Sequence, residues 1–287
     1  MLLFIGYVIV LGSILGGFMI AGGNPILLMH VSEFVVIGGV SIGVLIIASP
    51  KDVLNNVIRD IKEGFSGVSE TKDAFIDLLK LLYEMFMLSR RNGLIALDEH
   101  VGSPKDSAIF TRYPTFLKEK EHVDFLVNAL RPLIDGKIKP EQLHGVLEEQ
   151  LDAMEEEAGA GIGVMNLVGD SLPGIGIVAA VLGIINTMSA IAEGPEKVGE
   201  KVAAALTGTF LGVLGAYGFV NPLASRVKFN HRMKFMYYKV MLVSISGFAK
   251  GLAPLMAVEV ARRSLDKAIQ PEASELEEMM KSLGKKQ

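Results

Sequence analysis

The sequence predicts an all-α integral membrane protein, with four transmembrane helices, a large helical cytoplasmic domain and both termini in the cytoplasm. Half of its 287 residues are hydrophobic, and the mean hydropathy of +0.42 exceeds that of most soluble domains of this length. The apolar residues gather in long uncharged blocks, and the basic residues fall between those blocks. The absence of Cys excludes a disulfide framework, and the net charge of -4 argues against nucleic acid as a partner.

Four blocks are long enough, or nearly so, to cross a bilayer, which takes roughly 20 residues. They cover residues 2–21, 34–49, 171–192 and 202–225. The second block is the shortest, and it can recruit residues from the HVSE sequence before it. The first block lacks the positive n-region of a secretory signal, so we expect it to be a retained span.

The distribution of Lys and Arg predicts the orientation. Residues 1–50 carry none, residues 51–165 carry 14, residues 193–201 carry 2, and residues 226–287 carry 12. Basic residues mark the cytoplasmic side of a span. The predicted domains are therefore two spans in 1–50, a cytoplasmic helical domain in 51–165, two spans in 166–226, and cytoplasmic C-terminal helices in 227–287.

The cytoplasmic segments have helical periodicity. In residues 69–92, apolar side chains recur at spacings of three and four, and Gly93 provides a stop. Further helices are expected at 119–133, from Pro140 onward and after Pro271, and the apolar run 240–249 is expected to form a short buried or interfacial helix.

Small residues recur about every four positions in three of the spans. They are Gly12 and Gly16 in the first span, Gly176, Ala180, Gly183 and Thr187 in the third, and Ala204, Gly208, Gly212 and Ala216 in the fourth. Small residues at this spacing let helix backbones approach closely in lipid. Two interpretations stay open: packing within one chain, or packing against other subunits.

The predicted spans contain no Asp, Glu, Lys, Arg or His. Ion-translocating proteins usually keep such a side chain at membrane depth, since its cost there is repaid only by function. The polar groups available at depth are hydroxyls and amides, among them Thr209 and Tyr217. If the chain serves ion flow, another chain must therefore bring the carboxylate.

Several long blocks resemble the A subunits of flagellar motor stators, the MotA family. They are GYVIVLGSILGG, LLYEMFMLSRRNGLIALDEH, VGDSLPGIGIVAAVLGI, TGTFLGVLGAYGFVNPLA and APLMAVEVARR. The resemblance implies a ring of five A subunits around two single-span B subunits in the inner membrane. Each B helix would supply an essential Asp, and ions would pass between it and the last two spans of A. Ion flow would turn the ring and drive the rotor, with no cofactor or bound metal.

The resemblance assigns a rotor contact to Arg90 and Asp98, with the adjacent Arg91 and Glu99 able to share it. These residues would meet the switch-complex protein of the rotor. The alternative is ordinary solvated charge, which contributes only about 0–1 kcal/mol to stability. Since structure alone hardly needs such charges, electrostatic matching to a partner is the interpretation we favour.

Pro173 and Pro222 match two prolines that the family uses to couple ion flow to movement. Taken alone, Pro173 also suits the first turn of a helix, and Pro222 suits a kink or helix end. Asp170, just before Pro173, is expected to cap the third span rather than to handle ions directly.

The transported ion is expected to be the proton. Sodium needs several oxygen ligands, whereas a proton needs only a carboxylate and a water path. Sodium-driven relatives carry threonine at the position of Ala180 and a second one at Gly208, and this chain keeps Thr209 alone. Thr209 also has a structural alternative, a hydrogen bond to the carbonyl of Ala205.

Four alternatives remain. A sodium-driven stator differs only in the ion. A ring subunit of the ExbB/TolQ type, which energises envelope transport, usually has three spans. A stand-alone transporter is disfavoured by the uncharged spans. An enzyme is the weakest alternative, because the five His residues show no metal-ligand spacing and no nucleotide-binding loop occurs.

Overall fold

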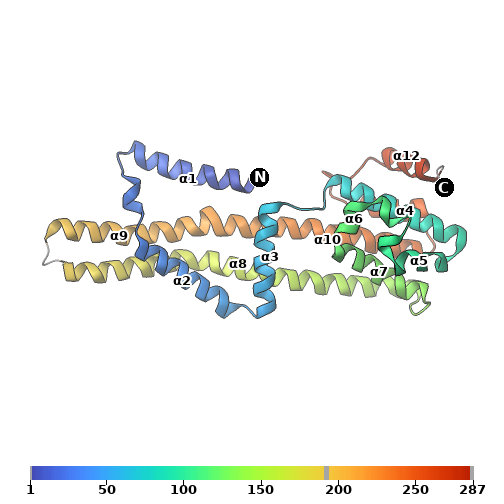
Figure 1. Ribbon diagram of the computed structural model, residues 1–287, viewed down its shortest axis with the longest axis horizontal. Helices are drawn as coiled ribbons and strands as arrows, with labels where there is room; N and C mark the ends of the chain where they lie inside the picture. The colour runs from blue at the N-terminus through green and yellow to red at the C-terminus, as the bar shows by residue number, and fades with distance from the viewer. Residues whose placement is uncertain (1, 191–193, 285–287) are drawn as a thin grey trace. The chain divides into compact units, whose positions relative to one another are not determined.

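The computed structural model describes residues 2–190 and 194–284, and within these ranges the regular secondary structure is entirely helical (Figure 1). Four of its helices are long and apolar enough to cross a membrane: Leu2–Ile20, Pro25–Ala48, and stretches within Pro140–Met188 and Pro195–Ala249. The chain is thus an all-helical, multi-pass membrane protein. The predicted end of the third span, at residue 192, lies outside the described residues.

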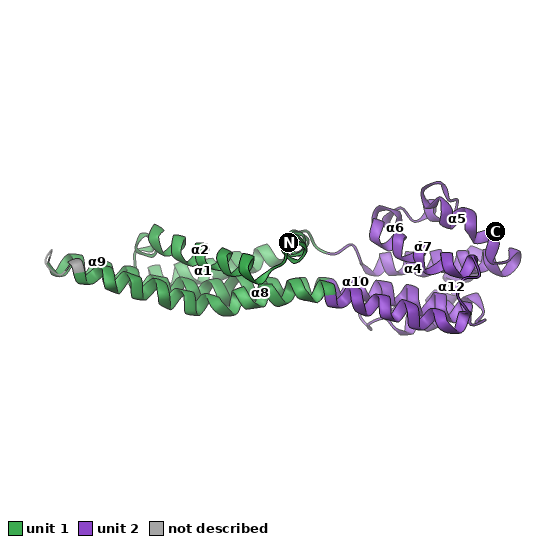
Figure 2. Ribbon diagram, turned by 90° about the horizontal axis from the view of Figure 1, so that it is seen from below, with its two compact units in different colours: residues 1–67, 157–230 green, residues 68–156, 231–287 purple. Residues whose placement is uncertain are grey.

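The chain forms two compact units (Figure 2). Unit 1 comprises residues 1–67 and 157–230, and unit 2 comprises residues 68–156 and 231–287. The predicted boundaries at 50, 165 and 226 follow the ends of membrane spans, whereas these units follow packing. Two of the unit boundaries fall inside continuous helices, α8 (Pro140–Ala190) and α10 (Asn221–Ala249).

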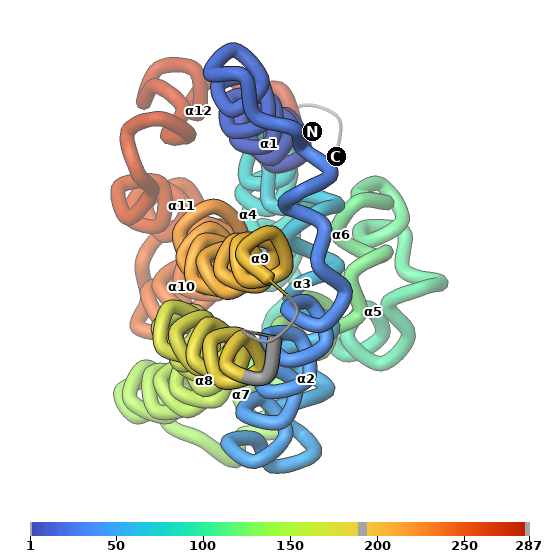
Figure 3. The backbone as a smooth tube through the Cα atoms, turned by 90° about the vertical axis from the view of Figure 1, so that its left-hand side faces the viewer, coloured from blue at the N-terminus to red at the C-terminus, as the bar shows by residue number. Residues whose placement is uncertain are grey.

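Unit 1 contains the apolar helices. Its elements are α1 (Leu2–Ile20), η1 (Pro25–Leu28), α2 (Val31–Ala48), α3 (Lys51–Ser66), the second part of α8, α9 (Pro195–Leu214), the π-helix η6 (Gly215–Val220) and the start of α10. Helices α2 and α8 both lie beside α9 (Figure 3). Most side chains of α1 and α2 remain exposed, as expected for helices that face lipid or another chain.

Tyr7 of helix α1 contacts the π-helix η6. Its hydroxyl donates to the carbonyl of Phe219 at 3.0 Å, and the two rings pack with centroids 4.9 Å apart. A π-helix leaves backbone groups without their usual partners. The Tyr7 hydroxyl therefore satisfies an acceptor that η6 offers.

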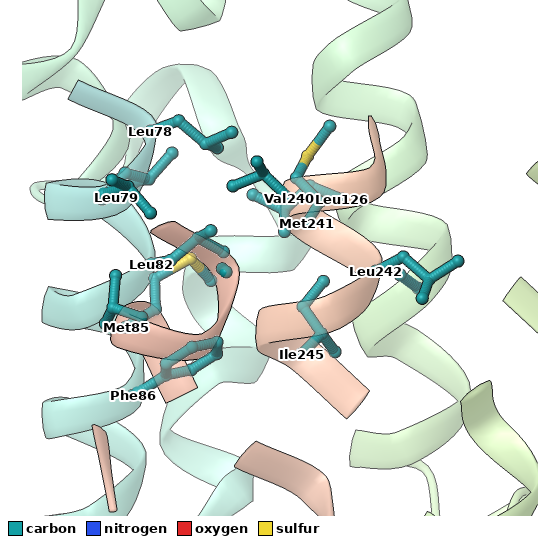
Figure 4. Packing of buried hydrophobic residues seen from close by; sticks show 14 of the residues in the cluster. Leu78, Leu79, Leu82, Met85, Phe86, Leu126, Val240, Met241, Leu242 and Ile245 are labelled. Atoms are coloured by element: carbon teal, nitrogen blue, oxygen red, sulfur yellow. The ribbon is translucent and has the colours of Figure 1, made fainter. Parts of the chain in front are cut away.

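Unit 2 contains a conventional hydrophobic core. Its elements are α4 (Lys72–Asn92), η2 (Leu94–Leu97), α5 (Asp98–Gly102), η3 (Pro104–Asp106), η4 (Phe110–Arg112), α6 (Pro114–Lys118), α7 (Lys120–Ile134), the first part of α8, the end of α10, α11 (Pro254–Arg263) and α12 (Ala273–Gly284). Fully buried side chains of α4, α7 and α10 interlock (Figure 4), including Phe86, Leu126 and Met241. This core fixes the position of the α4–α5 turn.

The helix predicted at 69–92 is confirmed as α4. Thr71 caps its N-terminus by accepting from the N–H of Ala74 at 3.3 Å. Gly93 ends it with φ 83°, a conformation that favours glycine. The run 240–249 is buried as expected, although it is the end of α10 rather than a separate helix.

Candidate functional site

Helices α8 and α9 touch backbone to backbone through glycines. A Cβ added to Gly176 would lie 2.8 Å from the carbonyl oxygen of Gly208 and 3.0 Å from Cα of Gly212. A Cβ added to Gly212 would lie 2.5 Å from the carbonyl oxygen of Leu172. No larger residue fits without moving a helix, so this part of the small-residue pattern is used within the chain.

The contact through small residues continues toward the C-terminal end of α8 and the N-terminal end of α9. A Cβ added to Gly183 would lie 2.9 Å from the Cβ of Ala205. Of the remaining small residues, Ala216 is fully buried, whereas Ala180 and Ala204 are partly buried. Gly12 and Gly16 of α1 differ, because no heavy atom of the described residues outside their own helix lies within 4 Å of their Cβ positions. The face of α1 stays open to lipid or another chain.

The two positions tied to ion choice lie at one level of the α8–α9 contact. The backbone nitrogen of Ala180 is 3.2 Å from the Cβ position of Gly208, and Thr209 is the next residue of α9. Thr207, not Thr209, donates to the carbonyl four residues before it, at 3.0 Å. The Thr209 hydroxyl makes no hydrogen bond within the described part of the chain, so it is available to a water or an ion.

Sequence reasoning missed a carboxylate at this level. Glu33 was expected in the connection before the second span, but α2 begins at Val31 and includes it. Its side chain is buried, with 5% of its surface exposed. A Cβ added to Gly208 would lie 2.9 Å from its Oε2 atom. The short second block could have pointed to Glu33, because extending this span backward into the HVSE sequence includes it.

Asp170 is not a helix cap. Helix α8 runs without a break from Pro140 to Ala190, so Asp170 and Pro173 lie in its interior. The expectation of a helix start near Ser171 was wrong, because the helix that begins at Pro140 has no stop signal before the apolar block. Ser171 donates to the carbonyl of Leu167 at 2.7 Å instead of capping. A proline here removes a backbone hydrogen bond and bends the helix.

Asp170 instead faces the start of α10. The side-chain nitrogen of Asn221 lies 3.5 Å from Oδ1 of Asp170. The Asn221 amide fits against Gly169, where an added Cβ would lie 1.8 Å from its Oδ1 atom. Pro222 is the next residue, and because α9, η6 and α10 form one continuous helix, Pro195–Ala249, it removes a backbone hydrogen bond inside that helix, as Pro173 does in α8. The contact therefore joins the neighbourhoods of Pro173 and Pro222.

Tyr217 lies in the π-helix that precedes this contact, and 67% of its surface is exposed. A π-helical turn inside a longer helix often marks a functional position. Tyr217 thus presents a hydroxyl outward from the fourth candidate span.

The charged residues assigned to the rotor contact cluster around the α4–α5 turn. Arg90 and Arg91 end α4, Asp98 and Glu99 begin α5, and all four are exposed. Asp98 accepts from Arg131 of α7 at 2.6 Å. The other three make no ion pair within the described residues, and they are free to meet an external surface.

Comparison with known proteins places the chain in a family. Residues 4–93 match the family described as Motility protein A N-terminal, and residues 118–239 match the MotA/TolQ/ExbB proton channel family. Motility protein A of Salmonella typhimurium is 33% identical over 283 residues, which is 99% of this chain and 96% of that protein. The chain belongs to the motility protein A family.

Other motility protein A relatives agree. The Escherichia coli protein of that name is 33% identical over 99% of this chain and 96% of its own length. The chemotaxis protein LafT of Vibrio parahaemolyticus is 30% identical over 96% of this chain and 97% of its own length. These relatives are motility and chemotaxis proteins, and the second matched family consists of proton channels.

The fold is that of solved motility protein A structures. A structure of MotAB from C. jejuni matches with a TM-score of 0.78 at 24% identity, over 92% of this chain and 95% of that one. The flagellar MotAB stator complex from Bacillus subtilis matches with a TM-score of 0.72 at 24% identity, over 92% and 94%.

Proposed function

We propose that the chain is the A subunit of a flagellar motor stator, which converts ion flow into torque on the rotor. The observation that carries the proposal is the similarity to Motility protein A at 33% identity over 99% of the chain. A match confined to residues 118–239 would fit an ExbB/TolQ-type ring equally well. The match of residues 4–93 to a motility-specific family favours the motor.

The chain crosses the inner membrane four times, with both termini and the segments 51–165 and 227–287 in the cytoplasm. The support is the charge distribution, since these segments hold nearly all the Lys and Arg. In this orientation the α4–α5 turn faces the rotor, and its exposed Arg90, Arg91 and Glu99 offer charges to the switch-complex protein.

A MotB-type partner with one membrane helix supplies the transporting Asp. The support is chemical, because residues 171–192 and 202–225 contain no Asp, Glu, Lys, Arg or His. Ala180 and Thr209 line the path beside that helix. Five A subunits surround two partners, and the open glycine face of α1 and the exposed faces of α8 and α9 serve contacts beyond the chain.

Deletion of the gene tests the function directly. Cells without the chain are expected to assemble flagella that do not rotate, and expression of the full chain is expected to restore rotation. Purification of the complex, followed by native mass spectrometry, is expected to count five A chains and two partner chains. Rotating flagella in the deletion strain would contradict the stator role.

A further inference from the structure

Glu33 occupies a contact among three membrane helices. It belongs to the first turn of α2, and its Oε2 atom faces Gly208 of α9. The Cβ position of Gly208 is in turn 3.1 Å from the Cβ of Ala179 in α8. The absence of a side chain at Gly208 therefore creates the space that the carboxylate fills.

The carboxylate of Glu33 is poorly satisfied by the chain. Its Oε1 atom accepts from the hydroxyl of Ser32 at 3.4 Å, a long hydrogen bond. Its Oε2 atom is buried without a hydrogen-bond partner among the described residues, and no Lys or Arg of those residues pairs with it. A buried unpaired carboxylate is costly in a membrane protein, and this cost is usually repaid by function.

The surroundings supply no permanent countercharge. On the segment entering α2, the buried Nε2 atom of His30, three residues earlier, also lacks a partner among the described residues. Titratable groups on the packed part of α9 are confined to its first two turns: Glu196, Lys197, Glu200 and Lys201. Element η1 and the membrane part of α8 between residues 171 and 188 carry none.

We propose that Glu33 is a proton-accepting carboxyl of this chain, placed beside the ion path at the level of Ala180 and Thr209. It takes a proton from hydronium in the water at the N-terminal end of α2, so that one O–H bond of hydronium breaks, an O–H bond of the carboxyl forms and water is left. The carboxyl then gives this proton to the Asp carboxylate of the MotB-type partner and returns to its charged form. This inference rests on the proposed function, and it adds a protonation site that belongs to the A subunit itself.

A purely structural role has a different signature. The helix dipole also favours an acid in the first turn, whether or not that acid takes up a proton. Glutamine keeps the shape and hydrogen bonds of Glu33 but cannot take up a proton. Aspartate keeps the carboxyl on a shorter side chain. The pair of substitutions therefore separates proton uptake from helix stability.

The test uses the full chain with its natural partner in its own cells. Rotation of tethered cells is measured against external pH for Glu33→Gln and for Glu33→Asp. The control is Glu196→Gln, which changes an exposed acid in the first turn of α9. Glu33→Gln is expected to slow rotation on the order of 100-fold, a typical effect of losing a proton-transfer group. Glu33→Asp is expected to keep rotation with a shifted pH profile, and Glu196→Gln is expected to behave as the unaltered chain.

A second readout does not depend on rotation. The purified complex is treated with dicyclohexylcarbodiimide, which modifies protonated carboxyls in apolar surroundings, and the peptide carrying Glu33 is weighed by mass spectrometry. Labelling that increases as pH falls, and that external sodium leaves unchanged, is expected. Unchanged rotation of Glu33→Gln, or the absence of label on Glu33, would overturn this inference while leaving the stator role intact. Rotation in the deletion strain would instead overturn the stator role.

Discussion

Because Gly169 has no side chain, the Asn221 amide has room to pack against it and to contact Asp170. Replacing Gly169 with alanine would place a Cβ 1.8 Å from the present position of the Asn221 oxygen, so the amide has to move. We expect Gly169→Ala to break the Asn221–Asp170 contact and to cost about 1–3 kcal/mol through overpacking. Thermal unfolding of the purified complex, followed by circular dichroism, measures this.

Gly174 provides the matched control for that substitution. It lies in the same helix, and its Cβ position has no heavy atom of the described residues outside that helix within 4 Å. Gly174→Ala is expected to leave the midpoint of thermal unfolding unchanged or slightly raised, because alanine stabilises a helix by about 1 kcal/mol relative to glycine. Equal unfolding midpoints of Gly169→Ala and Gly174→Ala would contradict the close contact at Gly169.

Arg90 belongs to the exposed charges of the α4–α5 turn. Since it makes no ion pair with another described residue, reversing its charge removes nothing that holds unit 2 together. Arg90→Glu is expected to impair swimming without lowering the yield of the complex, and a charge reversal on the rotor protein is expected to restore part of it. Lys139→Glu, at another exposed position, is the control. Normal swimming at low expression of Arg90→Glu argues against the rotor contact.

Glu70 forms a buried pair with His122, at 3.1 Å between Oε1 and Nε2. Burial alone would raise the pKa of the Glu70 carboxyl, but the hydrogen bond and charge of His122 outweigh it and hold this pKa below its usual value. Because the folded pKa is the lower one, the pair stabilises the fold fully at neutral pH. That stability is lost as pH falls below about 4.5, the ordinary value of a glutamate.

Glu70→Gln is therefore expected to lower the free energy of unfolding at pH 7 by about 1–3 kcal/mol, the range for a disturbed buried hydrogen bond. The difference from the unaltered complex is expected to shrink below pH 4.5. Urea unfolding of Glu70→Gln and of the unaltered complex, each at pH 7 and at pH 4, measures this difference. A difference independent of pH contradicts a role of the ionised carboxyl.

At the scale of elements, Pro173 interrupts the backbone hydrogen bonds of α8 in its membrane part. It lies inside the helix and cannot donate to the carbonyl of Gly169. Pro173→Leu restores that donor and stiffens the helix, so torque is expected to fall while the yield of the complex stays the same. Pro195→Ala is the control, since Pro195 lies at the start of α9, where its N–H has no helical partner. Intact torque in Pro173→Leu would exclude a coupling role.

The sequence predicted helices well where periodicity and stop signals agree. Helix α4 has both an N-cap at Thr71 and Gly93 at its end, and its bounds were anticipated within a few residues. Helix α8 has no such signal between the polar run after Pro140 and the membrane block. Apolarity marks the lipid-facing stretch, not the helix end, and a helix can continue through a change of surroundings without any local mark.

The candidate functional residues divide in the same way. The charges near the α4–α5 turn, the two prolines and the positions of Ala180 and Thr209 could be named from the sequence blocks that resemble the MotA family. The Asn221–Asp170 contact joins residues 51 positions apart, and Glu33 reaches Gly208 across an even longer separation. Such pairings depend on the register between helices, which single-chain patterns do not encode.

At the scale of the whole molecule, the choice of ion is a property of the assembled path. Near Gly208 the described residues include the carboxylate of Glu33 and the hydroxyl of Thr209, whereas the hydroxyl of Thr207 is already used in a hydrogen bond to the carbonyl of Ala203. Few neutral oxygens favour a proton over sodium, which needs several ligands. Swimming speed is expected to stay constant as sodium is replaced by potassium at fixed pH, and to fall when the proton gradient is dissipated. A speed that follows external sodium would assign the ion to sodium.

The π-helix η6 has a consequence for helical phase. A π-helical turn accommodates one residue more than the α-helix that surrounds it, and each residue of an α-helix accounts for about 100° of rotation. The side chains after Val220 are therefore turned about 100° from where an uninterrupted α9 would place them. Whether Asn221 faces Gly169 or points elsewhere is thus decided by the number of residues between Gly215 and Val220, more than by their chemistry.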